Sequence, residues 1–298
     1  MLSVLIPTYN YNALPLVSEI HSQLTKAGIA FEIICLDDAS KEMPVENEKI
    51  NALPNARYEI LPVNIGRSKI RNLLSKKANF NWLLYLDVDV FPKDEHFISN
   101  YLPYLDDEVK TVNGGILYQE EKPEKSKIFR WVYGKEREAL PYEIRSQKPY
   151  LRFLTLNYLI HKSVFDKVTF NETLPNLRHE DTLFSYNLME AKIPVIHINN
   201  PVYHLGLDVF ETAIRKENES LHALKNLTDN QLLPADYLRI STAISKIKKW
   251  NLSNIFVFLD RMFRSVLLKN LSGNHPYLPF FDLYRLGYLC SIDNKNKP

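Results

Sequence analysis

The sequence has little cysteine and no long hydrophobic run, and each absence argues against a class of protein. Its 298 residues include two cysteines, Cys35 and Cys290, which lie far apart in the chain. Cys35 falls inside an apolar stretch, so we expect two reduced thiols and no disulfide. A run of about 18 apolar residues, the length that spans a membrane as a helix, is absent.

Two further features are missing near the first residue. No basic segment, long apolar segment or small-residue cleavage site precedes the first apolar residues, so we expect no signal peptide and a cytoplasmic location. The stretch Pro7-Thr8-Tyr9-Asn10-Tyr11-Asn12 contains no glycine. It therefore lacks the glycine-rich loop that often cradles phosphate groups before a helix.

The net charge of +2 is small but unevenly spread. Residues 234–298 carry ten basic and four acidic residues, a net charge of +6, which leaves −4 for residues 1–233. The acidic larger part argues against nucleic-acid binding. The basic, aromatic segment 234–291 suits peripheral contact with an anionic membrane. A helical cap with solvated lysines and arginines, or a homodimer surface, explains the same pattern.

Short apolar runs alternate with helical patterns over the first hundred residues. This alternation predicts a Rossmann-like, mostly parallel central sheet flanked by helices, an α/β fold. We expect strands at 3–6, 31–36, 57–61 and 82–86, with helices starting near Leu14 and at Gly66. Gly28 stands where the first helix should end.

The second half of the chain is more mixed. The pattern predicts strands around 112–116 and at 154–161, a helix at 180–191 and a last strand at 193–198. Residues 119–149 suggest a long loop with one helical turn. From about Asp208 the pattern is helical, so we predict two domains, 1–207 and a helical extension, 208–298.

Polar clusters follow three of the predicted strands: Thr8-Tyr9-Asn10, Asp37-Asp38 and Asp87-Val88-Asp89. Ligands of doubly wound sheets bind at the carboxyl ends of the strands, where such clusters meet. Alternate residues of an extended chain share a side, so Asp87 and Asp89 can offer oxygen ligands to Mn²⁺ or Mg²⁺. The alternative for this D-x-D motif is a solvated turn.

The other candidates are each ambiguous alone. Asp38 could accept the N3–H of uracil, or Asp37 and Asp38 could form an Asx turn. Arg67 and Arg71 share a helix face and suit phosphate contact, or form an exposed basic face. Tyr9 could stack on a base or simply pack.

A second group of candidates lies later in the chain. Glu180 and Asp181 begin an apolar helix, where acidic residues often act only as caps, although a general base must also be such a group. His204 could complete a metal site or be structural.

Taken together, these motifs resemble family 2 glycosyltransferases of the GT-A fold. The resemblance covers roughly residues 1–206 in the expected order. The matching stretches are 3–10, 32–40, 64–67 with Arg71-Asn72, 84–89, Glu180-Asp181 and 200–204. The chain departs from the family pattern at Ala39, where glycine is usual, and at His179, which replaces a small residue.

The resemblance implies a role for each candidate residue. Pro7, Thr8 and Tyr9 would line the base and ribose site, and Asp38, with Asp37 beside it, would hold the base. Arg71, with Arg67 nearby, would approach the diphosphate. Asp87 would lie near the ribose and metal, while Asp89 and His204 would bind the metal. Asp181 would be the catalytic base, and Glu180 would touch the acceptor or donor sugar.

We therefore expect an inverting, metal-dependent hexosyl- or N-acetylhexosaminyl-transferase acting in polysaccharide or glycolipid synthesis. Its donor would be a nucleotide-sugar, with UDP favoured by Asp38, and its acceptor a glycan or a lipid-linked sugar. Such an enzyme would work at the inner face of the plasma membrane. Two alternatives stay open: a nucleotidyltransferase that makes nucleotide-sugars, which the glycine-free N-terminal loop disfavours, and a non-catalytic nucleotide-sugar or glycan-binding protein.

Overall fold

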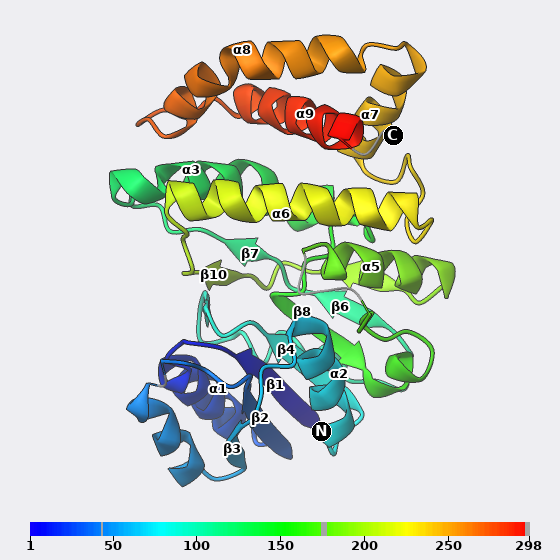
Figure 1. Cartoon of the computed structure of the whole chain (residues 1–298). Helices are drawn as coiled ribbons and strands as arrows, with labels where there is room; N and C mark the ends of the chain where they lie inside the picture. The colour runs from blue at the N-terminus through cyan, green and yellow to red at the C-terminus, as the bar shows by residue number, and fades with distance from the viewer. Residues whose placement is uncertain (43, 174–177, 296–298) are drawn as a thin grey trace. The chain divides into compact units, whose positions relative to one another are not determined.

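A computed structural model of the chain describes residues 1–42, 44–173 and 178–295, the last three by their backbone alone. The chain forms two compact units (Figure 1). Among the described residues, the first comprises 1–42, 44–119, 138–173 and 180–206, and the second comprises 120–137, 178–179 and 207–295. Every candidate site residue belongs to the first unit. The division of function between domains 1–207 and 208–298 stays a prediction.

The first unit is built on a seven-stranded sheet in the order β3-β2-β1-β4-β8-β6-β9. Its strands are β1 (Leu2–Thr8), β2 (Phe31–Asp37), β3 (Ala56–Ile60), β4 (Trp82–Leu86), β6 (Thr111–Asn113), β8 (Asn157–His161) and β9 (Val195–His197). All neighbours pair in parallel except β8, which runs antiparallel to both β4 and β6. The predicted α/β fold with a mostly parallel sheet is confirmed.

Helices of the first unit follow the predicted alternation. The longer ones are α1 (Leu14–Ala27), α2 (Arg67–Lys77) and α5 (Glu180–Glu190). Shorter ones are η1 (Val45–Ala52), η2 (Leu102–Tyr104), α4 (Tyr142–Ser146) and η5 (Lys162–Asp166). The apolar residues spaced along α1 are buried, and the helix ends at Gly28 as predicted. Stacked aromatic side chains form part of the core, where the ring centroids of Phe170 and Phe184 are 4.1 Å apart.

A second, three-stranded sheet corrects the sequence prediction. It contains β5 (Val90–Pro92), β10 (Val202–His204) and β7 (Ile116–Leu117), in the order β5-β10-β7. The prediction of one strand around 112–116 is wrong, because β6 and β7 belong to different sheets. The prediction that 193–198 forms the last strand is also wrong, since β10 follows it. Strands of two or three residues carry too little periodicity to detect.

The second unit is helical in its described part. Its helices are η3 (Lys125–Lys127), α3 (Ile128–Tyr133), α6 (Phe210–Asp229), α7 (Arg239–Lys249), α8 (Ser253–Leu271) and α9 (Leu278–Lys295). The predicted C-terminal helices are therefore present. The loop predicted at 119–149 instead holds η3, α3, a π-helical turn (Gly134–Glu138) and α4. Prolines near both ends of this segment favoured a loop, so the sequence did not predict the short helices.

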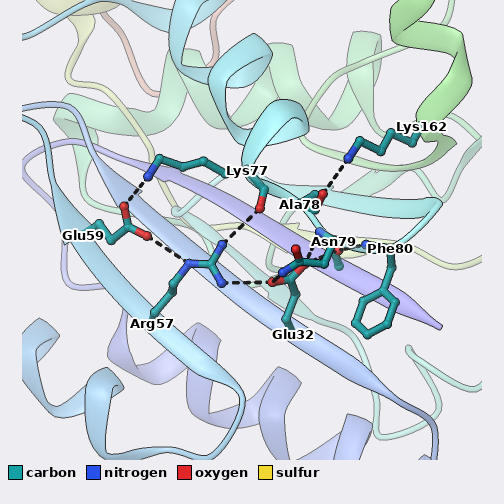
Figure 2. A network of polar contacts seen from close by, with 9 residues as sticks. Glu32, Arg57, Glu59, Lys77, Ala78, Asn79, Phe80 and Lys162 are labelled. Carbon is teal, nitrogen blue, oxygen red and sulfur yellow. Dashed lines mark hydrogen bonds and ion pairs between the residues drawn. The ribbon is translucent and has the colours of Figure 1, made fainter.

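A charged network includes residues near the amino ends of β2 and β3, the opposite ends of these strands from Asp37 and Ile60 (Figure 2). Arg57 on β3 pairs with Glu32 of β2 at 3.0 Å and with Glu59 at 2.9 Å, and it donates a hydrogen bond to the Lys77 carbonyl at 3.2 Å. Glu32 also accepts the backbone N–H of Asn79 at 2.6 Å. Because the charged groups of this network pair with one another and with backbone atoms of the protein, we interpret the network as structural.

Ala39 carries backbone strain at the family's usual glycine position. Its φ is +57°, in the left-handed region that disfavours a side chain. We predict that Ala39→Gly stabilises the fold by about 0.5–1 kcal/mol, because relief of this strain outweighs the added freedom of the unfolded chain. Chemical denaturation measures the change. A loss of stability would show that the Ala39 methyl group contributes packing that exceeds its strain.

Candidate active site

Three strand ends meet at one edge of the sheet, as the sequence predicted. Strands β2, β1 and β4 are parallel neighbours, so Asp37, Thr8 and Leu86 end at the same side. The backbone N–H of Asp38 donates to the carbonyl of Thr8 at 2.9 Å, which joins two of the clusters. The carboxyl edge of a parallel sheet is where α/β proteins bind their ligands.

The residues at the end of β1 and in the loop after it differ in how exposed they are. Thr8 is buried, with its hydroxyl 3.1 Å from the sulfur of Cys35, and Pro7 is half-buried. Tyr9 is 43% exposed, so its ring is the one that can stack on a base. Asn10 fixes the loop, because its side chain accepts the backbone N–H of Lys41 at 2.8 Å.

The two aspartates after β2 are held by hydrogen bonds within the chain. Asp37 is fully buried and accepts bonds from the Ser40 amide, the Ser40 hydroxyl and the Tyr58 hydroxyl at 2.7, 2.8 and 2.7 Å. The oxygens of Asp38 accept the backbone N–H groups of Ile65 and Gly66 at 2.6 and 2.8 Å. Asp38 thereby fixes the turn that starts α2, and contact of either aspartate with a nucleotide stays a prediction.

Arg71 of α2 links the acidic motif after β4 to the acidic motif that begins α5. Its guanidinium lies 2.9 Å from Asp87 and 3.5 Å from Glu180, and Arg67 lies 3.6 Å from the same Glu180 oxygen. The side chain of Arg71 is 5% exposed, whereas that of Arg67 is 50% exposed. Candidate residues from three distant parts of the sequence thus share one buried cation.

The charges of this cluster shift its pKa values. Burial alone would lower the pKa of Arg71, but the charges of Asp87 and Glu180 outweigh it and raise the pKa, so Arg71 stays protonated. Burial raises the pKa of Asp87, and the nearby charge of Asp89 adds to the rise, although Arg71 opposes it. A further cation beside Asp87 and Asp89 would relieve this repulsion.

Pairing of β5 with β10 brings Asp89 and His204 together. The strands are antiparallel with His204 opposite Val90, and the Leu205 amide donates to the Asp89 carbonyl at 2.8 Å. The Nε2 atom of His204 consequently lies 3.2 Å from the Asp89 carboxylate. A Cβ atom at Gly206 would come within 2.1 Å of that carboxylate, so a larger residue there would displace the Asp89 side chain.

A second layer of side chains orients His204. The Tyr118 hydroxyl lies 3.0 Å from His204 Nδ1 and donates a hydrogen bond to Glu138. Since that hydroxyl has one proton and Glu138 takes it, His204 donates its Nδ1–H to the tyrosine oxygen. Its Nε2 atom is then the one beside the Asp89 carboxylate, at 3.2 Å, and these two atoms need a proton or a shared cation between them. Metal-binding histidines are held by the same kind of outer contact.

The donor set fits a divalent cation that also binds a substrate. Among the described residues, no group of three or more His, Cys, Asp or Glu side chains is arranged to enclose a metal. Mg²⁺, however, is usually bound by one or two carboxylates together with substrate phosphates. Asp89 and His204, with Asp87 nearby, would form such an open site, in which a diphosphate would supply the remaining oxygens.

Asp181, predicted from the sequence to be the catalytic base, has a raised pKa. Burial, and then the charge of neighbouring Glu180, raise its pKa from 3.8 to about 6. Its carboxylate accepts the Thr182 amide at 2.7 Å, which fixes it at the start of α5. A base with a pKa near the working pH accepts a proton efficiently in the transition state.

Sequence comparison establishes the family. The profile of Glycosyl transferase family 2 matches residues 3–168, more than half of the chain. The chain belongs to glycosyl transferase family 2. An uncharacterized glycosyltransferase of Haemophilus influenzae is 35% identical over 91 residues, which cover 30% of this chain and 29% of that relative.

Solved structures similar to this family 2 chain show that its fold is GT-A. A mannosyltransferase from Pyrobaculum calidifontis, in complex with GDP-Man and Mn²⁺, has a TM-score of 0.57 at 13% identity. The match covers 99% of this chain and 87% of the mannosyltransferase. Glucosyl-3-phosphoglycerate synthase from Mycobacterium tuberculosis, with Mn²⁺, UDP and glucosyl-3-phosphoglycerate, has a TM-score of 0.51 at 13% identity. That match covers 79% of this chain and 81% of the synthase.

Sequence reasoning missed the residues behind the candidate metal site. Tyr118 and Glu138 carry no recognisable motif, because their position depends on the short strand β7 and the turn after α3. The only indication of Gly206 in the sequence is its place two residues after His204. Of the predicted residues, the structure gathers Arg71, Asp87 and Glu180, with Arg67 at the edge, and it pairs Asp89 with His204.

The contact between Tyr118 and His204 yields a prediction about metal affinity. Tyr118→Phe removes the hydroxyl that orients the imidazole, so we expect Mn²⁺ affinity to fall about tenfold, within the range found for outer-layer partners. Calorimetric titration with Mn²⁺ in the presence of the nucleoside diphosphate measures the change. Tyr277→Phe, at a position 56% exposed on the second unit, is the control. Equal affinities of both variants would contradict the assigned role of Tyr118.

Proposed function

We propose that this family 2 protein transfers a sugar from a nucleotide-sugar, with inversion, to a hydroxyl group of a glycan or lipid-linked acceptor. One observation carries the proposal: Arg71 contacts both Asp87, which follows β4, and Glu180, which precedes Asp181. A single buried cation therefore connects the side expected to bind the donor diphosphate with the proposed catalytic base.

Each residue in this cluster has a role in the proposed reaction. The acceptor oxygen bonds to the anomeric carbon while the bond between that carbon and the diphosphate oxygen breaks. Asp181 takes the hydroxyl proton, and the nucleoside diphosphate leaves with the bonding electron pair. Glu180 holds Arg67 and Arg71 in position. The Nε and Nη1 atoms of Arg71 are buried and make no hydrogen bond among the described residues, although Nη1 lies 3.5 Å from Glu180.

Asp89 and His204, with Asp87 beside them, would hold Mn²⁺ or Mg²⁺. The ion would neutralise negative charge that develops on the leaving diphosphate. We propose UDP as the nucleotide because Asp38 follows β2 at the carboxyl edge of the sheet, beside Thr8, and the exposed ring of Tyr9 is available for stacking. The role of the enzyme in polysaccharide or glycolipid synthesis, its homodimerisation and its location at the inner membrane face remain predictions.

Release of nucleoside diphosphate from UDP- and GDP-sugars tests the proposal. We expect metal-dependent release from one donor even with water as acceptor, and loss of that release in Asp181→Asn. Asp166→Asn, at an exposed aspartate of the same unit, should release the diphosphate at the wild-type rate. If the wild type bound a nucleotide-sugar but never cleaved it, the non-catalytic alternative would replace our proposal.

A further inference from the structure

Helix α8 in the second unit is apolar both on the inner face, which packs within the unit, and on the outer face, which is exposed. It runs alongside α9, and its inner face buries Val257, Leu267 and Leu271 in the apolar clusters of that unit (Figure 1). The inner face also holds Asp260, which is 4% exposed and paired with Arg264. A helix at the surface of a soluble protein normally turns polar residues outward on the opposite face.

The outer face of α8 is instead strongly apolar. Five large side chains there, which we call the α8 strip, are exposed: Ile255 at 53%, Phe258 at 62%, Met262 at 50%, Phe263 at 42% and Val266 at 57%. Four of them, at 255, 258, 262 and 266, recur every three or four residues, so they line one side of the helix. Just before α8, Trp250 is 65% exposed. Contiguous exposed apolar groups of this kind mark interaction surfaces.

The charges around the strip have one sign. Between Tyr237 and Phe281 the sequence has a single acidic residue, the buried Asp260. Exposed basic side chains in the same stretch include Arg239, Lys246, Lys249, Arg261 and Lys269. Arg261 and Lys269 belong to α8 itself, within the length of the strip. This stretch therefore combines exposed apolar side chains with positive charge, and its one acidic residue is buried.

We propose that the α8 strip binds the surface of an anionic lipid bilayer. An amphipathic helix with Phe, Met and Trp beside Lys and Arg lies in the membrane interface, where the apolar groups enter the acyl region and the cations meet anionic headgroups. A second copy of the chain fits less well, because a symmetric contact would bring Arg261 and Lys269 of both copies together. No described helix is long and apolar enough to cross a membrane.

Vesicle co-sedimentation of the full chain tests this proposal. We expect binding to vesicles of phosphatidylcholine with phosphatidylglycerol, and much weaker binding to phosphatidylcholine alone. The double variant Phe258→Ser with Met262→Ser should bind at least about tenfold more weakly, since two apolar side chains no longer enter the bilayer. Replacing Arg261 and Lys269 by glutamine should cost about fivefold for each cation, with a loss that shrinks at high salt.

Controls separate membrane contact from folding and from the donor site. Val45→Ser with Val63→Ser changes two exposed apolar residues of the first unit, 79% and 61% exposed, and should leave vesicle binding unchanged. The α8 double variant should keep its thermal unfolding and its binding of nucleoside diphosphate, so failure here is distinct from failure of the proposed function. Absence of vesicle binding by the wild type would overturn the proposal. A wild-type dimer that becomes monomeric in the α8 double variant would overturn it too.

Discussion

Replacing Asp181 by asparagine is expected to slow sugar transfer by a factor of about 100 to 10,000, the contribution of a positioned general base. The same change should make the fold more stable near neutral pH. Burial and Glu180 raise the pKa of Asp181 from 3.8 to about 6, so the ionised carboxylate is unfavourable in the folded chain. An amide of the same shape removes that cost. Loss of activity with gain of stability distinguishes a functional residue from a structural one.

The sign of the pH effect follows from the raised pKa. The folded chain binds the Asp181 proton more readily than the unfolded chain, so this group's contribution to stability falls as the pH rises from 3.8 to about 6. The full shift corresponds to at most about 3 kcal/mol, and partial solvent access leads us to expect about 1–2 kcal/mol. For the wild type, kcat/KM should decline as the pH falls through about 6, because the base becomes protonated.

Chemical denaturation and rate measurements on Asp181→Asn check both parts. Below pH 3.8 both folded and unfolded wild type carry the proton, so the stability difference from the variant should vanish there. The exposed variant Asp166→Asn should match the wild type in rate and stability. An Asp181→Asn variant that is both inactive and less stable would indicate that Asp181 supports the fold, not proton transfer.

Replacing Arg71 by methionine should destabilise the fold by about 3–5 kcal/mol, because it leaves Asp87 and Glu180 close together without their buried cation. Arg71→Lys should lose less, since it keeps the charge but not the geometry of two contacts. The unfolding free energy, measured by chemical denaturation, gives the cost. Nucleotide affinity should fall as well, provided that the variant is assayed where it is still folded.

Arg67 provides the matched control one helical turn away. Its side chain is 50% exposed and lies 3.6 Å from Glu180, so Arg67→Met should change stability by less than about 1 kcal/mol. If both arginine variants had the same small effect, the Arg71 contacts would not hold the cluster together, and the link between Asp87 and Glu180 would lose its significance.

The main sheet, and the site residues at its carboxyl edge, could be predicted from the sequence for clear physical reasons. Strands β1, β2 and β4 are buried on both faces, so they stand out as continuous apolar runs that stop at polar clusters. Parallel pairing then places Thr8, Asp37 and Asp87 at one edge without any further information. The acidic start of α5 was also visible, because Glu180 precedes a clear apolar helix.

The sequence could not predict the small sheet or the partners of the candidate residues. Whether β10 pairs with β5 depends on contacts between short strands that are distant in sequence, and this pairing alone brings His204 to Asp89. Likewise, the sequence does not indicate whether a carboxylate at a strand end binds a ligand or another residue of the protein. Asp37 turned out to be enclosed by Ser40 and Tyr58, whereas Asp87 contacts Arg71.

Calorimetric titration of UDP with and without Mn²⁺ is the decisive test of a metal-dependent nucleotide site at Asp89. We expect weak binding without metal, because Asp87 and Asp89 repel the diphosphate, and at least about tenfold tighter binding with Mn²⁺. Asp89→Ala should abolish that gain, while Asp107→Ala, at an exposed aspartate of the same unit, should retain it. Metal-independent binding, or an unchanged gain in Asp89→Ala, would rule out a metal site at Asp89. Failure of UDP, GDP, CDP and dTDP alike to bind would rule out the nucleotide site itself.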